Sequence, residues 1–242
     1  MDVRSEPAKA VAPEPRQRWR LVVGRAPDAL RLGQRETIEA WESAIDASGL
    51  PAARATSGPP RPKASFGAPL QVGIAADAEL IDLFLVARLP RWEVREALQS
   101  RMPLGWRLVD LSDVWLGGPP LAGLVAAADY RITLDADAEA AAVSEACHAI
   151  TAESSVPRER EKGTTIIAYD LRPLLAGLEV VEAGPPVAIR ARTRFHPSLG
   201  TGRPEEVLAA LAHQVGQPLV AARVVRERLV LADEMPEDDG DG

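Results

Sequence analysis

The stretch Thr56–Asp82 reads Thr-Ser-Gly-Pro-Pro-Arg-Pro-Lys-Ala-Ser-Phe-Gly-Ala-Pro-Leu-Gln-Val-Gly-Ile-Ala-Ala-Asp-Ala-Glu-Leu-Ile-Asp. Its prolines and glycines restrict the backbone path, while Arg61, Lys63 and Ser65 present two cations and a hydroxyl at the start of a strand. One interpretation is a binding site on a fixed loop. The simpler alternative is a rigid connector whose prolines only limit the chain.

Around this stretch the hydrophobic pattern predicts six elements in the order βαββαβ. Arg18 and Arg20 alternate with apolar residues, as in a half-buried strand. Ile38, Trp41 and Ile45 recur at helical spacing, and Gly49 follows as a helix-ending glycine. The other expected elements are strands at Lys63–Val72, Glu79–Ala87 and Trp106–Asp110, and a helix from Pro90. This order is that of a ferredoxin-like unit.

After a Gly- and Pro-rich connection at Leu111–Ala127, a similar pattern begins again. Strands are expected from Tyr130 to Leu134 and at Ser155–Arg160, Thr164–Tyr169, Val187–Arg194 and Ala222–Leu231; helices are expected around Val143–Ile150 and at Pro204–Val215, with a short helical turn at Leu171–Ala176. The sequence therefore predicts an α+β fold of two packed ferredoxin-like units, at 16–115 and 128–231, with a linker at 116–127.

Both ends of the chain have unusual composition. Residues 1–15 lack apolar periodicity, and residues 232–242 are acidic, so a disordered arm and a disordered acidic tail are expected. Six acids and no base follow Arg228, so they account for all but one unit of the net charge of -7. There is no apolar run of membrane-spanning length and no signal-peptide pattern, which indicates a cytoplasmic protein.

The histidines and the single cysteine offer little for chemistry. Cys147 alone excludes an internal disulfide and multi-cysteine metal clusters, and its helical spacing favours a core position. His148 is adjacent and therefore points about 100° away on a helix. His196 and His213 have no metal-ligand partner at a recognisable spacing, and the glycine pairs do not match phosphate-cradling loops. We therefore predict no metal and no cofactor.

The chain contains several separated motifs: Ser48-Gly49-Leu50-Pro51, Pro62-Lys63-Ala64-Ser65-Phe66-Gly67-Ala68-Pro69-Leu70 with Gly73, the acids Glu79 and Asp82, Asp170-Leu171-Arg172-Pro173-Leu174, and Arg203-Pro204-Glu205-Glu206-Val207-Leu208. In these motifs and their order the chain resembles the bacterial radical-SAM-linked protein family, whose biochemistry is not settled. The resemblance extends over nearly all of residues 17–230. It implies a functional link to radical-SAM proteins.

The chain departs from the family pattern at two places. It reads Gly33-Gln34-Arg35-Glu36 where the family has Ser-His-Leu-Asp, and Arg61 where the family has a histidine between two prolines. A mechanism that uses imidazole as a base or metal ligand at these places is therefore in doubt. The loop favours holding an anion over moving a proton.

The first candidate binding site combines the loop with the acidic strand. Its members are Arg61, Lys63, Ser65, Glu79 and Asp82, with Glu36 of the first helix as a further candidate. The cations would hold phosphate and the acids would orient a ribose or act as a base. The alternative is that Asp82, on an otherwise apolar face of its strand, forms a buried ion pair with Lys63 or Arg61.

The second candidate is a row of arginines for phosphate binding. Arg190, Arg192 and Arg194 share one strand face at a spacing of about 6.7 Å, and Arg226 and Arg228 have the same spacing on the last strand. Such a row would contact successive phosphates. The alternative is an exposed edge that charge keeps soluble.

These observations predict that the chain is a non-catalytic RNA-binding accessory protein in tRNA or rRNA processing or modification. A partner enzyme would supply the chemistry. The segment Arg16–Leu70 has nine bases and five acids, a local charge of +4. One alternative is an RNA-processing or modifying enzyme that uses Lys63, Ser65, Glu79 and Asp82. Another is an adaptor that docks onto a radical-SAM protein or a ribonuclease.

Overall fold

A computed structural model describes residues 13–29, 31–163 and 165–235. Most of the predicted arm and of the predicted acidic tail lies outside these residues. Within them, Ala232–Glu234 forms a short 3-10 helix, η3, instead of a disordered start of the tail. Glu234 stabilises this turn because its carboxylate accepts hydrogen bonds from the Leu231 backbone N–H and the Arg228 side chain, at 2.8 and 2.9 Å.

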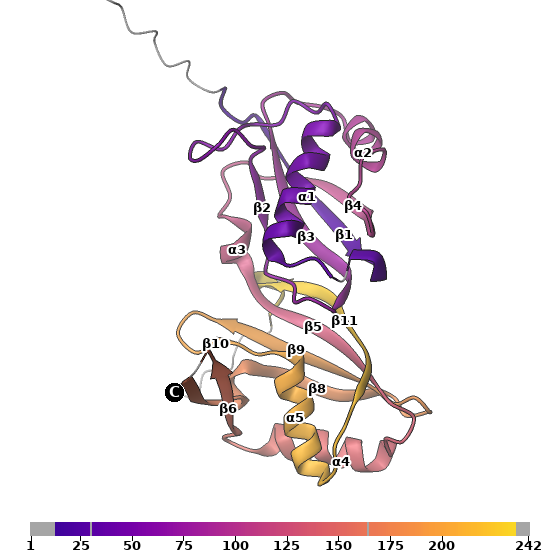
Figure 1. The fold of residues 1–242 in the computed structure, drawn as a ribbon. Helices are drawn as coiled ribbons and strands as arrows, with labels where there is room; N and C mark the ends of the chain where they lie inside the picture. Colours follow the sequence, from indigo (N-terminus) through magenta and orange to yellow (C-terminus); the bar gives the residue numbers. More distant parts are fainter. Residues whose placement is uncertain (1–12, 30, 164, 236–242) are drawn as a thin grey trace, which may run out of the picture.

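The first half of the chain forms an antiparallel part of the sheet with two helices. It contains β1 (Gln17–Arg25), the 3-10 turn η1 (Pro27–Ala29), α1 (Gln34–Ala47), β2 (Ala64–Phe66), β3 (Ala75–Leu85), α2 (Arg91–Gln99) and β4 (Trp106–Val114). β1 lies between β3 and β4, and β2 pairs with the outer side of β3. The strand order is thus β4-β1-β3-β2 (Figure 1).

Both helices of this half pack on one face of its strands. Trp41 of α1 and Val94 of α2 are fully buried in one apolar cluster with Leu21 of β1 and Leu83 of β3. Gly49 follows α1 with a φ of +73°, a conformation that glycine adopts without steric cost, so the predicted helix end is confirmed.

The strand expected at Lys63–Val72 is much shorter in the structure, where β2 has three residues. The chain leaves the sheet at Gly67, which packs so closely that an added Cβ would lie 2.6 Å from Leu229 Cδ1. The carbonyls of Ala68 and Pro69 then accept hydrogen bonds from Arg226 instead of from a strand. Side-chain anchoring therefore replaces strand pairing in this loop.

The second half continues the same sheet. It contains α3 (Leu121–Leu124), β5 (Val125–Leu134), α4 (Ala140–Ala152), β6 (Pro157–Lys162), β7 (Thr165–Asp170), the turn η2 (Arg172–Leu174), β8 (Leu175–Glu182), β9 (Ala188–His196), β10 (Gly200–Thr201), α5 (Pro204–Val215) and β11 (Ala221–Leu231). Its main strand order is β8-β9-β5-β11, while β6 and β7 form a separate hairpin. Figure 1 shows α4 and α5 together below these strands.

Two sequence expectations for this half are corrected. The turn expected at Leu171–Ala176 ends at Leu174, and the strand β8 follows, because irregular pairing with β9 interrupts the simple alternation that would reveal a strand. The expected linker at 116–127 includes α3 and the first residues of β5. Leu121 and Ala127 are fully buried, so this segment is part of the packed fold.

The two halves meet where β11 pairs in parallel with β3, through Val225 with Ala75 and Arg226 with Ala76. The structure therefore confirms a mixed α+β fold, built on a nine-stranded and mostly antiparallel sheet. Each half has its own apolar cluster beneath its helices. Among the described residues, no helix has the length and apolar character needed to span a membrane.

Candidate nucleic-acid interface

Glu79 forms a buried ion pair with Arg226, a partner 147 residues later in the chain. Arg226 Nε donates to Glu79 Oε1 at 2.6 Å, and its remaining nitrogens bond to Glu79 and to the carbonyls of Pro69 and Ala68. Burial alone would lower the pKa of the Arg226 guanidinium, but the adjacent carboxylate outweighs this effect and the pKa is raised. The Glu79–Arg226 ion pair therefore holds the loop that follows β2 in place, through the carbonyls of Ala68 and Pro69.

Asp82 pairs with Arg18 and Arg20 of β1, and not with Lys63 or Arg61. Arg18 Nη2 lies 2.5 Å from Oδ2, and Arg20 Nε lies 2.8 Å from Oδ1. Arg18 also donates to the carbonyls of Gly118 and Pro119, at 3.0 and 2.8 Å. The expected buried ion pair exists with different partners, because β1 is the strand next to β3 and its register places Arg20 opposite Asp82.

The five residues of the first candidate site are not brought to one place. Glu79 and Asp82 are three positions apart on β3, so they point to opposite faces of the sheet. Arg61 is half-exposed and lies 3.7 Å from Glu42, and Lys63 Nζ lies 4.6 Å from the centre of the Phe84 ring. Ser65 of β2 is the one member placed beside Asp82, since the two residues are directly opposite each other in the sheet, whereas Glu36 accepts a hydrogen bond from Gly33 N at the start of α1.

Carboxylates bind the arginines of the second candidate site. Asp129 accepts hydrogen bonds from Arg192 at 2.6 Å and from Arg228 at 3.1 Å, while Glu227 accepts from Arg190 at 2.8 Å. Burial alone would raise the pKa of Asp129, but the two arginines outweigh it and the pKa is lowered. The side chain of Arg194 also has an interaction partner. This sheet face is a network of ion pairs.

A different basic surface lies at the other end of the molecule. Arg16 precedes β1, Arg88 follows β3, and Trp115 and Leu116 follow β4, and together they line a groove of about 450 Å³. Arg18 and Asp113 also line it. Trp115 is 77% exposed, and no ion pair engages Arg16 or Arg88 in the described part of the chain. The groove therefore combines free cations with an accessible aromatic ring.

Lys63 does not line the groove, but it lies near it on the side of the proline-rich loop. The Phe84 ring lies between Lys63 and Arg18, with Arg18 Cζ 5.4 Å from its centre, and Arg18 lines the groove. We use the name basic groove for the surface that the exposed side chains of Arg16, Lys63, Arg88 and Trp115 form in and beside this groove. With Arg18, Arg20, Asp82 and Asp113 included, the region has five cations and two acids, a local charge of +3.

The sequence interpretation did not name Trp115. A signal was available, since Trp115 stands before Gly-Gly-Pro-Pro, where no continuing strand offers it a buried face. The glycines also let the chain pass close to the ring: a Cβ at Gly117 would lie 3.2 Å from Trp115 Cε2.

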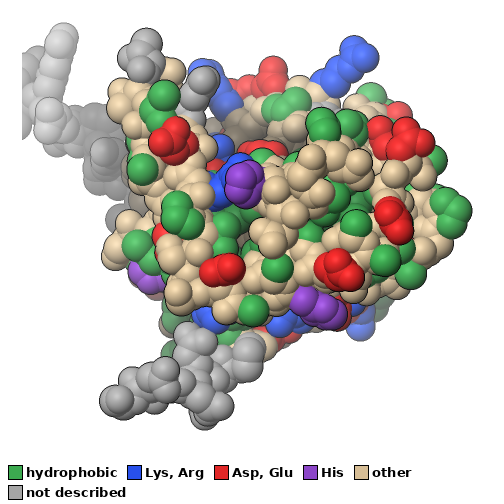
Figure 2. Space-filling view, turned by 90° about the horizontal axis from the view of Figure 1, so that it is seen from below, with side chains coloured by type: hydrophobic (Ala, Val, Ile, Leu, Met, Phe, Trp, Pro, Cys, Tyr) green, Lys and Arg blue, Asp and Glu red, His purple; other side chains and the backbone are tan. Residues whose placement is uncertain are grey.

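The face of the second half that is seen from below lacks this combination. In Figure 2, which views the second half from below, acidic and apolar side chains are scattered and the basic ones form no continuous patch. Cys147 is buried in α4, and burial raises the pKa of its thiol to about 11. Among the described residues, no three His, Cys, Asp or Glu side chains form a group that would hold a metal ion.

A family model described as "Uncharacterized protein conserved in bacteria (DUF2344)" matches residues 18–207. The chain belongs to this family. The match to DUF2344 includes strands of both halves of the sheet, but not β11, and most of the motifs that carried the sequence resemblance. No curated protein matches the chain.

Two solved structures share a distant likeness with this DUF2344 protein. A chain of "Crystal Structure of a Cbf5-Nop10-Gar1 Complex" has a TM-score of 0.48 and 10% identity, over 86% of this chain and 48% of that chain. A chain of "Crystal structure of the archaeal box H/ACA sRNP Nop10-Cbf5 complex" has a TM-score of 0.40 and 12% identity, over 85% and 46%. This chain thus matches about half the length of each, and both TM-scores are too low to establish a common fold.

Proposed function

We propose that this protein is an RNA-binding accessory factor that holds single-stranded RNA in the basic groove. The observation that carries the proposal is the exposed Trp115 ring beside Arg16 and Arg88, two cations without carboxylate partners in the described chain. Aromatic rings stack on bases of any sequence, and cations beside them neutralise the phosphates between those bases. Lys63, stacked over Phe84, lengthens the path for a strand.

The charge arrangement supports a local site in an otherwise acidic protein. Phosphate binding depends on cations that are free to displace counterions, not on the total charge of the chain. The exposed cations of the groove meet this condition, whereas Arg190, Arg192 and Arg228 are neutralised by carboxylates. RNA would therefore bind at the first half of the protein.

The biological setting of the proposal is tRNA or rRNA processing or modification, with a radical-SAM protein or a ribonuclease as the partner that supplies the chemistry. Each half has the strand order of a ferredoxin-like unit, β4-β1-β3-β2 in the first and β11-β5-β9-β8 in the second. We propose that the fold consists of two such units joined edge to edge. A non-catalytic role is favoured because Glu79 and Asp82 are both engaged in buried ion pairs.

The test compares two exposed tryptophans. Trp115→Ala removes the ring of the groove, and Trp92→Ala removes a ring that is 66% exposed elsewhere, on α2. A short fluorescein-labelled oligouridine is titrated with each protein at low salt. Stacking contributes about 1–3 kcal/mol per base, so Trp115→Ala weakens binding about fivefold or more while Trp92→Ala leaves it unchanged.

Equal affinities of the two variants would contradict the proposal, as would the absence of RNA binding by the unaltered protein. The adaptor alternative gives a different result, because partners captured from a lysate would then remain bound after nuclease treatment while the oligouridine does not bind.

A further inference from the structure

A second cavity lies where the two halves of the sheet meet. It has a volume of about 560 Å³, within the range of small-molecule sites. Its walls come from both halves: the loop Gln71–Ile74 before β3, the N-terminal residues of β11, and the first turns of α5. This cavity is at the start of β3, whereas the basic groove is beyond its end, so the 11-residue strand, about 35 Å long, separates them.

The cavity exists because β3 and β11 pair only briefly. The two strands run parallel at Val225 and Arg226, but before Ala75 the chain turns at Gly73, with a φ of +86°, and moves away from β11. In the described chain, no strand pairs with residues Ala221–Val224 on this side. A short sheet edge therefore faces the cavity.

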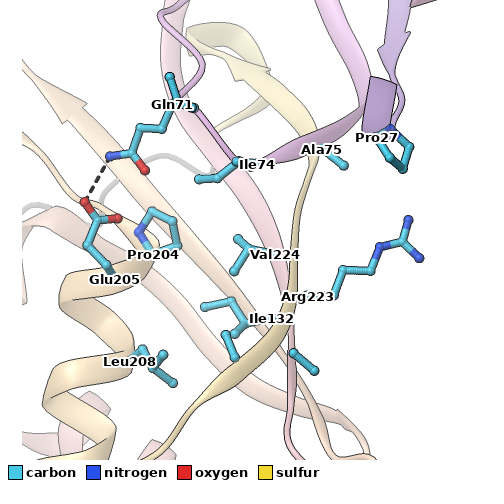
Figure 3. A pocket seen from close by; sticks show the side chains of 14 residues that line it. Pro27, Gln71, Ile74, Ala75, Ile132, Pro204, Glu205, Leu208, Arg223 and Val224 are labelled. Carbon is cyan, nitrogen blue, oxygen red and sulfur yellow. Dashed lines mark hydrogen bonds between the residues drawn. The ribbon is translucent and has the colours of Figure 1, made fainter. Parts of the chain in front are cut away.

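The lining has an apolar floor and one uncompensated charge. Ile74, Ile132, Leu208 and Val224 form the apolar part (Figure 3). Arg223 also lines the cavity, but it precedes Val224 in β11, so its exposed side chain extends from the opposite face of that strand (Figure 3). It has no ion pair or hydrogen bond in the part of the chain that the structure describes.

The acid on the opposite side already has partners. Glu205 Oε1 accepts a hydrogen bond from Gln71 Nε2 at 3.0 Å, drawn in Figure 3, and lies 3.8 Å from Arg203 Nη1. The hydrogen bond also joins the loop of the first half to α5 of the second. The charge that remains for a ligand to neutralise is therefore the positive charge of Arg223.

We propose that this cavity binds a small molecule with an apolar body and a single anionic group. The apolar body covers Ile74, Ile132, Leu208 and Val224, and the anionic group passes the unpaired edge of β11 to pair with Arg223 on the other face of the strand. The exposed backbone edge of β11 supplies hydrogen-bonding groups for further polar atoms of the ligand. Because both halves line the cavity, the ligand contacts the two at their junction and stabilises it.

The experiment uses the full chain and the fluorescent probe 1-anilinonaphthalene-8-sulfonate, which has an aromatic body and one sulfonate. Its bound fraction is followed by fluorescence and is displaced with decanoate or with decanol, which has a similar chain and no charge. Decanoate is expected to bind about tenfold or more tightly than decanol, since one charge-assisted hydrogen bond contributes about that factor.

Arg223→Gln is expected to remove this preference for decanoate. Arg101→Gln, an exposed arginine outside the cavity, is the matched control and keeps it. Leu208→Trp fills the cavity and weakens the probe and both competitors together, provided that its near-ultraviolet circular dichroism is native. Backbone amide NMR signals of Gln71–Ala75 and Ala221–Val224 shift on addition of decanoate.

Three outcomes would overturn the proposal: no saturable probe binding, equal decanoate affinity of the Arg223→Gln and Arg101→Gln proteins, or signal shifts elsewhere in the protein. Binding of an alternating valine–glutamate peptide without binding of decanoate would also overturn it, because the sheet edge would then accept an extended peptide. None of these outcomes depends on RNA binding, which the Trp115→Ala variant tests separately.

Discussion

Three buried arginines and the three exposed cations of the basic groove carry the same charge but differ in what their side chains contact. Arg18, Arg25 and Arg226 are each 2% exposed or less. They hold loops together by donating to backbone carbonyls: Gly118 and Pro119 for Arg18, Ala29, Leu32 and Gln71 for Arg25, and Ala68 and Pro69 for Arg226.

The groove cations Arg16, Lys63 and Arg88 are exposed and form no ion pair in the described chain. The comparison shows that a count of basic residues does not predict a nucleic-acid site. Of the nine bases between Arg16 and Leu70, three belong to β1: Arg18 and Arg20 pair with Asp82, and Arg25 donates to a loop carbonyl. Three more, Arg35, Arg54 and Arg61, pair with acids of α1. Under the proposal, the cations that bind phosphate are those that no carboxylate neutralises.

The largest effect that would test this division is expected for Arg226→Met. It leaves the carboxylate of Glu79 buried without a partner and removes the donors to two loop carbonyls, so the free energy of unfolding falls by about 3–5 kcal/mol. Urea denaturation measures the change. Arg228→Met is the matched control: its side chain is 42% exposed, and the expected loss is below about 1 kcal/mol. Similar losses in both variants would remove the distinction between interior and surface arginines.

A somewhat smaller effect is expected for Asp82→Asn. It leaves Arg18 and Arg20 facing each other without a carboxylate, which costs about 3 kcal/mol of unfolding free energy, the lower end for a broken buried pair because Arg20 is partly hydrated. The measurement is again urea denaturation, with Asp77→Asn on the exposed start of β3 as the control. A loss below about 1 kcal/mol would mean that Asp82 is not the counter-ion on which the two arginines depend.

The smallest effect is expected for Glu206→Gln and has the opposite sign. Both carboxylate oxygens of Glu206 are buried, and their polar neighbours are the Tyr169 side chain and Arg160, whose Nη1 lies 3.7 Å from Oε1. Burial raises the pKa of Glu206 above its ordinary value of 4.5. The folded state therefore retains this proton to a higher pH than the unfolded state, and stability falls as the pH rises above 4.5.

Because glutamine does not titrate, Glu206→Gln is expected to stabilise the protein at neutral pH, by on the order of 1 kcal/mol, and to have little effect below pH 4.5. Urea denaturation at the two pH values measures this difference. Destabilisation at neutral pH would show that the ion pair with Arg160 outweighs the cost of burying the charge.

The sequence predicted local structure better than it predicted partners. The helix Pro204–Val215 and the apolar faces of α1 and α4 agree with the structure because helical periodicity and a proline in the first turn are local signals. The strand β8 was missed because irregular pairing with β9 disrupts the alternation of its side chains. The partner of Glu79 was missed because Arg226 lies 147 residues away.

The sequence analysis named only one residue of the proposed groove, because the others come from segments that are distant in the sequence. Lys63 was named as a binding residue from its loop, but Arg16 and Arg88 meet Trp115 only because β1, β3 and β4 are adjacent in the sheet. No local pattern in the sequence shows which arginine will be neutralised by a carboxylate on a neighbouring strand. The pairing of strands decides it.

The most direct test of the central claim is the salt dependence of oligouridine binding in two double variants. Arg16→Gln with Arg88→Gln removes two free cations, and Arg190→Gln with Arg192→Gln removes two that are bound to carboxylates. For single strands each phosphate contact contributes about 0.7 to the slope of log K against log salt. The first pair is therefore expected to reduce the slope by about 1.4 and the second to leave it unchanged. A reduced slope only in the second pair, or an equal reduction in both, would contradict the account.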